Sequence, residues 1–141
     1  MDENELEIEW KSFLAVGVPE MDAEHRKFIS RVNELNLAIV AAKDKATVRQ
    51  AMDVMLSEAA KHFKHEEELL AQWRYPHAAA HAAKHAALWS QFGGLVREFE
   101  QAELSFVWAV KGLKVKQLLV AHLVKEDLAY RDFLRSRSSQ C

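Results

Sequence analysis

Several residue types are scarce in this 141-residue sequence, and each scarcity excludes a class of protein. The one cysteine, Cys141, is the last residue, which excludes an internal disulfide framework and a cysteine-based zinc knuckle. Four glycines and two prolines leave few turn signals, and no alternating strand pattern of useful length is present. The apolar runs are too short to cross a bilayer. The sequence therefore predicts an almost entirely helical chain.

An excess of charge of either sign is also missing. The formal net charge is -2, and acidic and basic residues are interspersed, so no basic patch for nucleic acid is present. The first ten residues are acidic and lack the apolar segment of a secretory signal. We therefore expect a cytoplasmic protein that neither binds nucleic acid nor inserts into a membrane. Half of the residues are hydrophobic, which is enough to build the core of one domain.

The apolar periodicity divides the chain into an N-terminal arm and one domain. Residues 1–18 form the arm, and residues 19–141 are predicted to form an all-α, antiparallel up-down four-helix bundle. The first helix is expected to begin at Pro19, because proline is well tolerated in the first turn. Glu20, Asp22 and Glu24 follow it and favour the positive end of the helix dipole.

The other three helices have weaker boundary signals. Thr47 and Gln50 have the spacing of a capping box, which predicts the start of the second helix at Thr47. The third helix is expected to begin at Pro76. The fourth is expected to cover residues 105–133, although the glycines between helices three and four blur that boundary.

Two of the predicted helices carry an apolar seam that ligand-type residues interrupt. The seam of the second helix has spacings of three and four and consists of Val48, Met52, Met55, Ala59, His62, Glu66, Leu69 and Trp73. The corresponding seam of the third helix consists of Ala78, His81, His85, Leu88, Phe92, Leu95 and Phe99. Each polar pair is separated by four residues and points to one side. Buried imidazole or carboxylate groups are costly unless they are paired or bind a metal ion.

Ligand-type residues are expected on the inner faces of all four helices. They comprise His25, His62, Glu66, His81, His85, His122 and Asp127. Helical bundles build dinuclear metal sites in this way. Five imidazoles and two carboxylates are too many for one tetrahedral zinc ion, and they suit two first-row ions such as iron or manganese.

The same residues lie in motifs that resemble those of the hemerythrin family. The motifs are VGVPEMDAEH, HFKHEE, YPHAAAHAAKH and HLVKED, preceded by Trp10, and the resemblance covers nearly the whole chain. Single pairs are weak signals, whereas seven matching positions in order are strong. Leu118 stands where the family often has tryptophan, which is a packing change that leaves the ligand set intact.

The resemblance implies two iron ions joined by an oxo or hydroxo bridge. The implied ligands are His81, His85 and His122 on one iron, His25 and His62 on the other, and Glu66 and Asp127 bridging both. In octahedral coordination this set leaves one position open, on the iron with two histidines. The implied function is therefore reversible binding of molecular oxygen for carriage, storage or delivery, without enzymatic activity.

A sensor of oxygen, nitric oxide or redox state, or a small di-iron oxidoreductase, could use the same cluster. A one-chain sensor would need an output domain, and we find no sign of one in the sequence. Di-iron oxidases are typically rich in carboxylates, whereas imidazoles outnumber carboxylates here, which favours binding over oxidation. The side chains expected to form an apolar wall around the site are Leu69, Leu88, Leu119 and Leu123.

Other polar residues near the motifs are interpreted as bystanders. His65 lies off the seam of the second helix, and His77 lies in the first turn of the third, so both are expected to face solvent. Glu67 and Glu68 are expected to form a solvated acidic face.

Helix geometry and the family resemblance disagree about the second carboxylate. At 100° per residue the helical neighbour of His122 is Glu126, whereas Asp127 is rotated by roughly 140°. We follow the family pattern and predict Asp127, because the fourth helix has two adjoining inner stripes. The stripes are Leu119, His122, Ala129 and Phe133, and Leu123, Asp127, Tyr130 and Leu134. A local π-type widening would bring Asp127 closer to His122.

Overall fold

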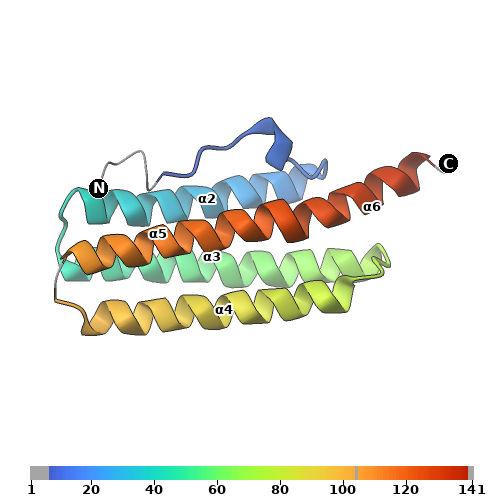
Figure 1. Ribbon diagram of the computed structural model, residues 1–141. Coiled ribbons are helices and arrows are strands. Elements are labelled where there is room, and N and C mark those ends of the chain that lie inside the picture. Colours follow the sequence, from blue (N-terminus) through green and yellow to red (C-terminus); the bar gives the residue numbers. More distant parts are fainter. Residues whose placement is uncertain (1–6, 104, 140–141) are drawn as a thin grey trace.

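A computed structural model describes residues 7–103 and 105–139, which form four long helical columns side by side (Figure 1). The first three columns are α2 (Pro19–Val40), α3 (Lys45–Gln72) and α4 (Ala78–Gln101). The fourth consists of α5 (Ser105–His122), the π-helical turn η2 (Leu123–Asp127) and α6 (Leu128–Ser139). Consecutive columns contact each other, and α5 also contacts α2, which closes the bundle. The prediction of an all-α four-helix bundle with an N-terminal arm is confirmed.

The arm lies along α2 and contains the short 3₁₀ helix η1 (Ser12–Leu14) (Figure 1). The side chain of Asn33 holds it at one point by accepting from the Ile8 amide at 2.7 Å and donating to the Ile8 carbonyl at 2.8 Å. The carboxylate of Asp22 holds it at another by accepting from the Val16 amide at 2.7 Å. Directly after Val16, Gly17 has a φ of 85°, a conformation that favours glycine.

Two helix starts differ from the sequence prediction. Asp44, and not Thr47, is the N-cap of the second column, because its side chain accepts a hydrogen bond from the Thr47 amide at 2.8 Å. The helix therefore begins at Lys45. Pro76 belongs to a turn in which the Ala78 amide donates to the Tyr75 carbonyl at 3.1 Å, so α4 begins two residues later than predicted.

The described core consists of two hydrophobic clusters with the ligand-type residues between them. The larger cluster includes Phe28, Phe63 and Leu88, and the smaller one includes Met21 and Leu70. Along α2, His25 lies between Met21 of the smaller cluster and Phe28 of the larger one. In the antiparallel α3 the order is reversed, and the chain passes from Ala59 of the larger cluster through the ligand pair to Leu70 of the smaller one.

The predicted seams are one residue out of register in two places. Leu70 and Val96 are buried, whereas Leu69 and Leu95 are half-buried. A strict alternation of three and four residues drifts against a period of 3.6, which moves the inner face by one position over a long helix.

The fourth column changes register at its π-helical turn. The Leu128 amide donates to the carbonyl of Leu123, five residues earlier, which inserts one extra residue into the turn. Beyond it Tyr130 is buried and Ala129 is exposed, so the stripe predicted to include Ala129 is wrong at that position. The predicted widening itself is confirmed.

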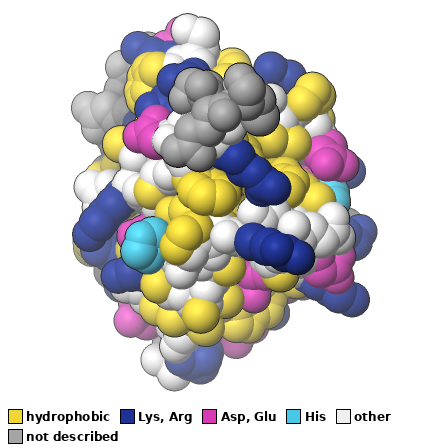
Figure 2. Space-filling model, turned by 90° about the vertical axis from the view of Figure 1, so that its right-hand side faces the viewer, with side chains coloured by type: hydrophobic (Ala, Val, Ile, Leu, Met, Phe, Trp, Pro, Cys, Tyr) yellow, Lys and Arg dark blue, Asp and Glu magenta, His cyan; other side chains and the backbone are white. Residues whose placement is uncertain are grey.

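None of the helices within the described part of the chain is both long and apolar enough to span a membrane. On the end of the bundle shown in Figure 2, hydrophobic side chains are interspersed with acidic and basic ones.

Candidate metal centre

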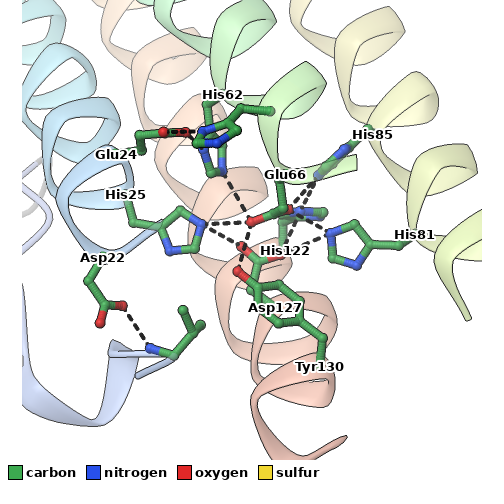
Figure 3. Close-up of polar contacts among 12 residues, drawn as sticks. Asp22, Glu24, His25, His62, Glu66, His81, His85, His122, Asp127 and Tyr130 are labelled. Atoms are coloured by element: carbon green, nitrogen blue, oxygen red, sulfur yellow. Dashed lines mark hydrogen bonds and ion pairs between the residues drawn. The ribbon is translucent and has the colours of Figure 1, made fainter. Parts of the chain in front are cut away.

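All seven residues selected from the sequence converge at one level of the bundle (Figure 3). Each column contributes at least one, and every one of them is at most 7% exposed. The residues and their elements are His25 from α2, His62 and Glu66 from α3, His81 and His85 from α4, His122 from α5, and Asp127 from η2. The structure therefore brings together the whole predicted set, whereas ligation by each residue stays a prediction.

The carboxylate of Glu66 lies at the centre of this cluster, and its two oxygens face different histidines. Oε2 is 3.0 Å from Nε2 of His25 and 3.3 Å from Nε2 of His62. Oε1 is 2.8 Å from Nε2 of His81 and 3.0 Å from Nε2 of His85. Glu66 can therefore offer one oxygen to each of two metal positions.

Asp127 divides its oxygens in the same way. Its Oδ2 is 3.3 Å from Nε2 of His25, whereas its Oδ1 is 3.1 Å from Nε2 of His81 and 3.2 Å from Nε2 of His122. Although fully buried, neither oxygen accepts a hydrogen bond from a described group. A buried carboxylate without hydrogen bonds is costly unless a cation balances its charge.

These contacts define two overlapping groups of candidate ligands. One contains His81, His85 and His122, the other contains His25 and His62, and both share the two carboxylates. Within each group, one atom from every residue lies within 4.8 Å of the others. This division agrees with the one that the family resemblance implies.

The cluster needs positive charge as well as proximity. Nε2 of His85 and Nε2 of His122 are 3.1 Å apart, and at most one proton can lie between them. Neutral histidines protonated at Nδ1 would direct only lone pairs toward one another and toward two carboxylates. Two divalent or trivalent cations remove this repulsion, so the donor set fits a dinuclear metal centre.

The π-helical turn explains why Asp127 and not Glu126 faces the cluster. Asp127 is 1% exposed, whereas Glu126 is half-buried. In an ideal α-helix these two residues would have the opposite placement relative to His122. The extra residue per turn lowers the rotation between successive side chains and brings the position five residues after His122 under it.

Three further side chains contact the cluster from outside, and the sequence alone missed their roles. Glu24 Oε1 is 2.9 Å from Nδ1 of His62, and its other oxygen contacts His65. His65 is thus only partly turned to solvent, as its side chain is 36% exposed. No sequence signal distinguishes Glu24 from its acidic neighbours in the first turns of α2.

The other two outer contacts come from Glu67 and Tyr130. Glu67 Oε2 is 3.0 Å from Nδ1 of His85, so Glu67 is only partly on a solvated acidic face and also contacts the cluster. Glu68 is exposed as predicted, and so is His77. The Tyr130 hydroxyl donates to Glu66 Oε2 at 2.9 Å, and its position three residues after Asp127 is the signal that could have indicated this role.

Electrostatics in the metal-free protein favour protonated histidines beside ionised carboxylates. Burial lowers the pKa of His62, but hydrogen bonds to Glu24 and Glu66 outweigh it and raise the pKa to about 10. Burial also lowers the pKa of His81, but hydrogen bonds to Asp127 and Glu66 outweigh it and raise the pKa to about 9. Burial opposes ionisation of Glu66 and Asp127, yet the surrounding histidines keep both pKa values below normal. Protons thus supply part of the positive charge that metal ions would bring.

The fold and the cluster define a four-helix-bundle protein built to bind metal ions. The chain belongs to the hemerythrin HHE cation binding domain family, which it matches over residues 16–134. It is 26% identical to a bacteriohemerythrin of Stenotrophomonas maltophilia over 93% of this chain and 84% of that protein. It is 28% identical to a hemerythrin-like protein of Naegleria gruberi over 89% of this chain and 92% of that protein. A bacteriohemerythrin of Pseudomonas aeruginosa is 24% identical over 93% of this chain and 84% of that protein.

Proposed function

We propose that the chain holds two iron ions and binds molecular oxygen reversibly, as a carrier or store and not as an enzyme. The observation that carries this proposal is the division of the cluster into a three-histidine and a two-histidine group that share two carboxylates. The unequal groups leave the two-histidine position with fewer ligands, and therefore with room for a small molecule. The choice of iron is what the resemblance to the hemerythrin family implies, and the Stenotrophomonas relative carries the name bacteriohemerythrin.

Bound iron would supply the electrons that oxygen binding requires, while the protein supplies ligands and a dry environment. Five neutral imidazoles against two carboxylates make the ligand set less electron-rich than that of a carboxylate-dominated site. The bridging carboxylates are fixed by their positions on α3 and η2, and Tyr130 restrains Glu66 further through its hydrogen bond.

Apolar side chains are expected to form a wall that limits the access of water to the cluster. Leu88, Leu119 and Leu123 are buried, and Leu69 is half-buried. Phe63 stacks on the ring of His85 with centroids 4.1 Å apart and an interplanar angle of 16°. A dry site strengthens electrostatic interactions and slows the loss of a bound anion to solvent.

Metal analysis and a visible spectrum test the proposal together. Protein produced with ample iron should contain two irons per chain and should develop a colour on exposure to oxygen. Oxygen removal and readmission should cycle this colour many times. One tightly bound zinc and no iron would contradict the metal assignment. Net consumption of oxygen, or bleaching after a few cycles, would instead indicate an oxidoreductase.

Two matched pairs of variants separate ligands from neighbours. His62→Ala and His85→Ala should each remove or destabilise an iron ion, because each deletes an Nε2 that faces Glu66. Their controls, His65→Ala and His77→Ala, lie at partly or fully exposed positions outside the cluster and should retain both ions. Loss of the colour in a control to the same degree as in its partner would contradict the proposed ligand set.

A further inference from the structure

Two of the five clustered histidines have a carboxylate behind them. Nδ1 of His62 is 2.9 Å from Glu24, and Nδ1 of His85 is 3.0 Å from Glu67. Figure 3 shows Glu24 approaching His62 from the side opposite Glu66. His25 differs, because its Nδ1 is buried without a hydrogen-bond partner among the described groups. The histidines are therefore not equivalent as ligands.

An ionised carboxylate at Nδ1 can only accept a hydrogen bond, so it holds the imidazole proton on that nitrogen. The lone pair of the neutral ring is then on Nε2, which is the atom that faces Glu66 in both His62 and His85. The contact also fixes the ring orientation and makes Nε2 a stronger donor to a cation.

The two contacts are distributed one to each metal position and join different helices. Glu24 extends from α2 to His62 of α3, in the two-histidine group. Glu67 extends from α3 to His85 of α4, in the three-histidine group. A change at either glutamate should thus act on one metal position before the other.

We propose that Glu24 and Glu67 are positioning residues, and that each sets the affinity and tautomer of one metal position independently. This inference rests on the proposed dinuclear centre. Both glutamates are partly exposed, with 30% and 38% of their side chains accessible, so their replacement leaves no buried cavity. The variants should therefore fold.

To test this, iron(II) is titrated into the metal-free chain in the absence of oxygen. Competition with a chelator gives the affinities of the first and the second iron ion. Glu24→Ala should weaken one of the two ions about 10–100-fold, and Glu67→Ala the other, as is typical for loss of a carboxylate behind a ligand histidine. The variants Glu24→Gln and Glu67→Gln keep an accepting oxygen and should show smaller losses. Glu68→Gln is the matched control, because Glu68 is exposed beside Glu67 and should change neither affinity.

The Nδ1–H proton signals of ¹⁵N-labelled histidine in the iron(II) protein provide a second measurement, which distinguishes a positioning role from a purely structural one. The Nδ1–H signal of His62 should shift or exchange faster in Glu24→Ala and stay unchanged in Glu67→Ala, with the converse for His85. Equal weakening of both ions by both variants, or affinities and signals equal to those of the control, would overturn the inference. A wild-type chain that takes up fewer than two ions would instead overturn the proposed function.

Discussion

One half of the bundle contains the candidate metal centre, and the other half contains the contact between Asn36 and Gly112. Both halves bury polar side chains in the core, but the buried polar groups find partners in different ways. In one half, seven imidazole and carboxylate side chains face one another. In the other half, Asn36 is 1% exposed and donates from its side chain to the backbone carbonyl of Gly112 at 3.3 Å. The first arrangement needs an added cation, whereas the second includes a hydrogen bond that joins α2 directly to α5. Buried polarity therefore indicates a ligand only where the polar groups cannot satisfy each other.

The largest effect is expected in the half with the metal centre, from Asp127→Ala. The substitution deletes the carboxylate whose two oxygens face both histidine groups, so iron content should fall below two and the oxygen-dependent colour should disappear. Glu126→Ala is the control, because Glu126 lies outside the cluster, and it should keep both. Metal analysis and the visible spectrum measure these outcomes. The reverse result would place the bridging carboxylate at Glu126.

Metal removal should lower the stability of the whole bundle while leaving it helical. Ions present at 1,000 times their dissociation constant stabilise the folded chain by about 4 kcal/mol per site. We therefore expect the melting temperature to fall by roughly 10 °C or more, with little change in the helical circular dichroism signal. Equal melting temperatures for the two forms would contradict ligands buried in the core.

The pH dependence of the metal-free protein should reveal which half holds the titrating groups. The raised pKa values of about 10 for His62 and about 9 for His81 mean that their protonated forms stabilise the fold. This contribution is complete below the unfolded pKa of about 6.5 and is lost as the pH rises through the folded values. The free energy of unfolding should thus fall by a few kcal/mol between pH 6.5 and 9, and the urea midpoint should decrease with it.

The iron-loaded protein is the control for this pH effect. Its ions replace the protons, so its urea midpoint should change much less over the same range. A parallel decrease in both forms would place the titrating groups outside the cluster.

Smaller effects are expected in the half without the metal centre, beginning with Gly112→Ala. A Cβ at Gly112 would lie 2.0 Å from Oδ1 of Asn36, so the substitution must push α2 and α5 apart or displace Asn36. We expect a loss of about 1–3 kcal/mol, typical of an overpacked core, in metal-free and iron-loaded protein alike. Chemical denaturation of both forms measures it.

Gly94→Ala provides the matched control for this packing effect. A Cβ at Gly94 would meet only the flexible end of Arg97, at 3.8 Å. Because alanine is a better helix former, we expect a gain of about 0.5–1 kcal/mol. Loss of iron in Gly112→Ala without loss of stability would show that the two halves are coupled.

The sequence was most informative where a signal repeats within one helix. Spacings of four residues put His62 with Glu66, and His81 with His85, on one face, and no tertiary information was needed for that. It was least informative at local boundaries, where Asp44 displaced Thr47 as the N-cap. Several residues of similar capping ability stand close together there, and only the backbone conformation selects among them.

By itself the sequence determined the all-helical class and the four columns, because periodicity fixes which side of a helix is buried. The seven residues that converge followed from the sequence only together with the family resemblance, since spacing alone would have selected Glu126 in place of Asp127. The tertiary structure decided what each of those residues faces. Which oxygen of Glu66 faces which histidine, and which carboxylates stand behind His62 and His85, depend on the rotation and axial offset of neighbouring helices. Those quantities arise from packing between columns, and no pattern within a single helix specifies them.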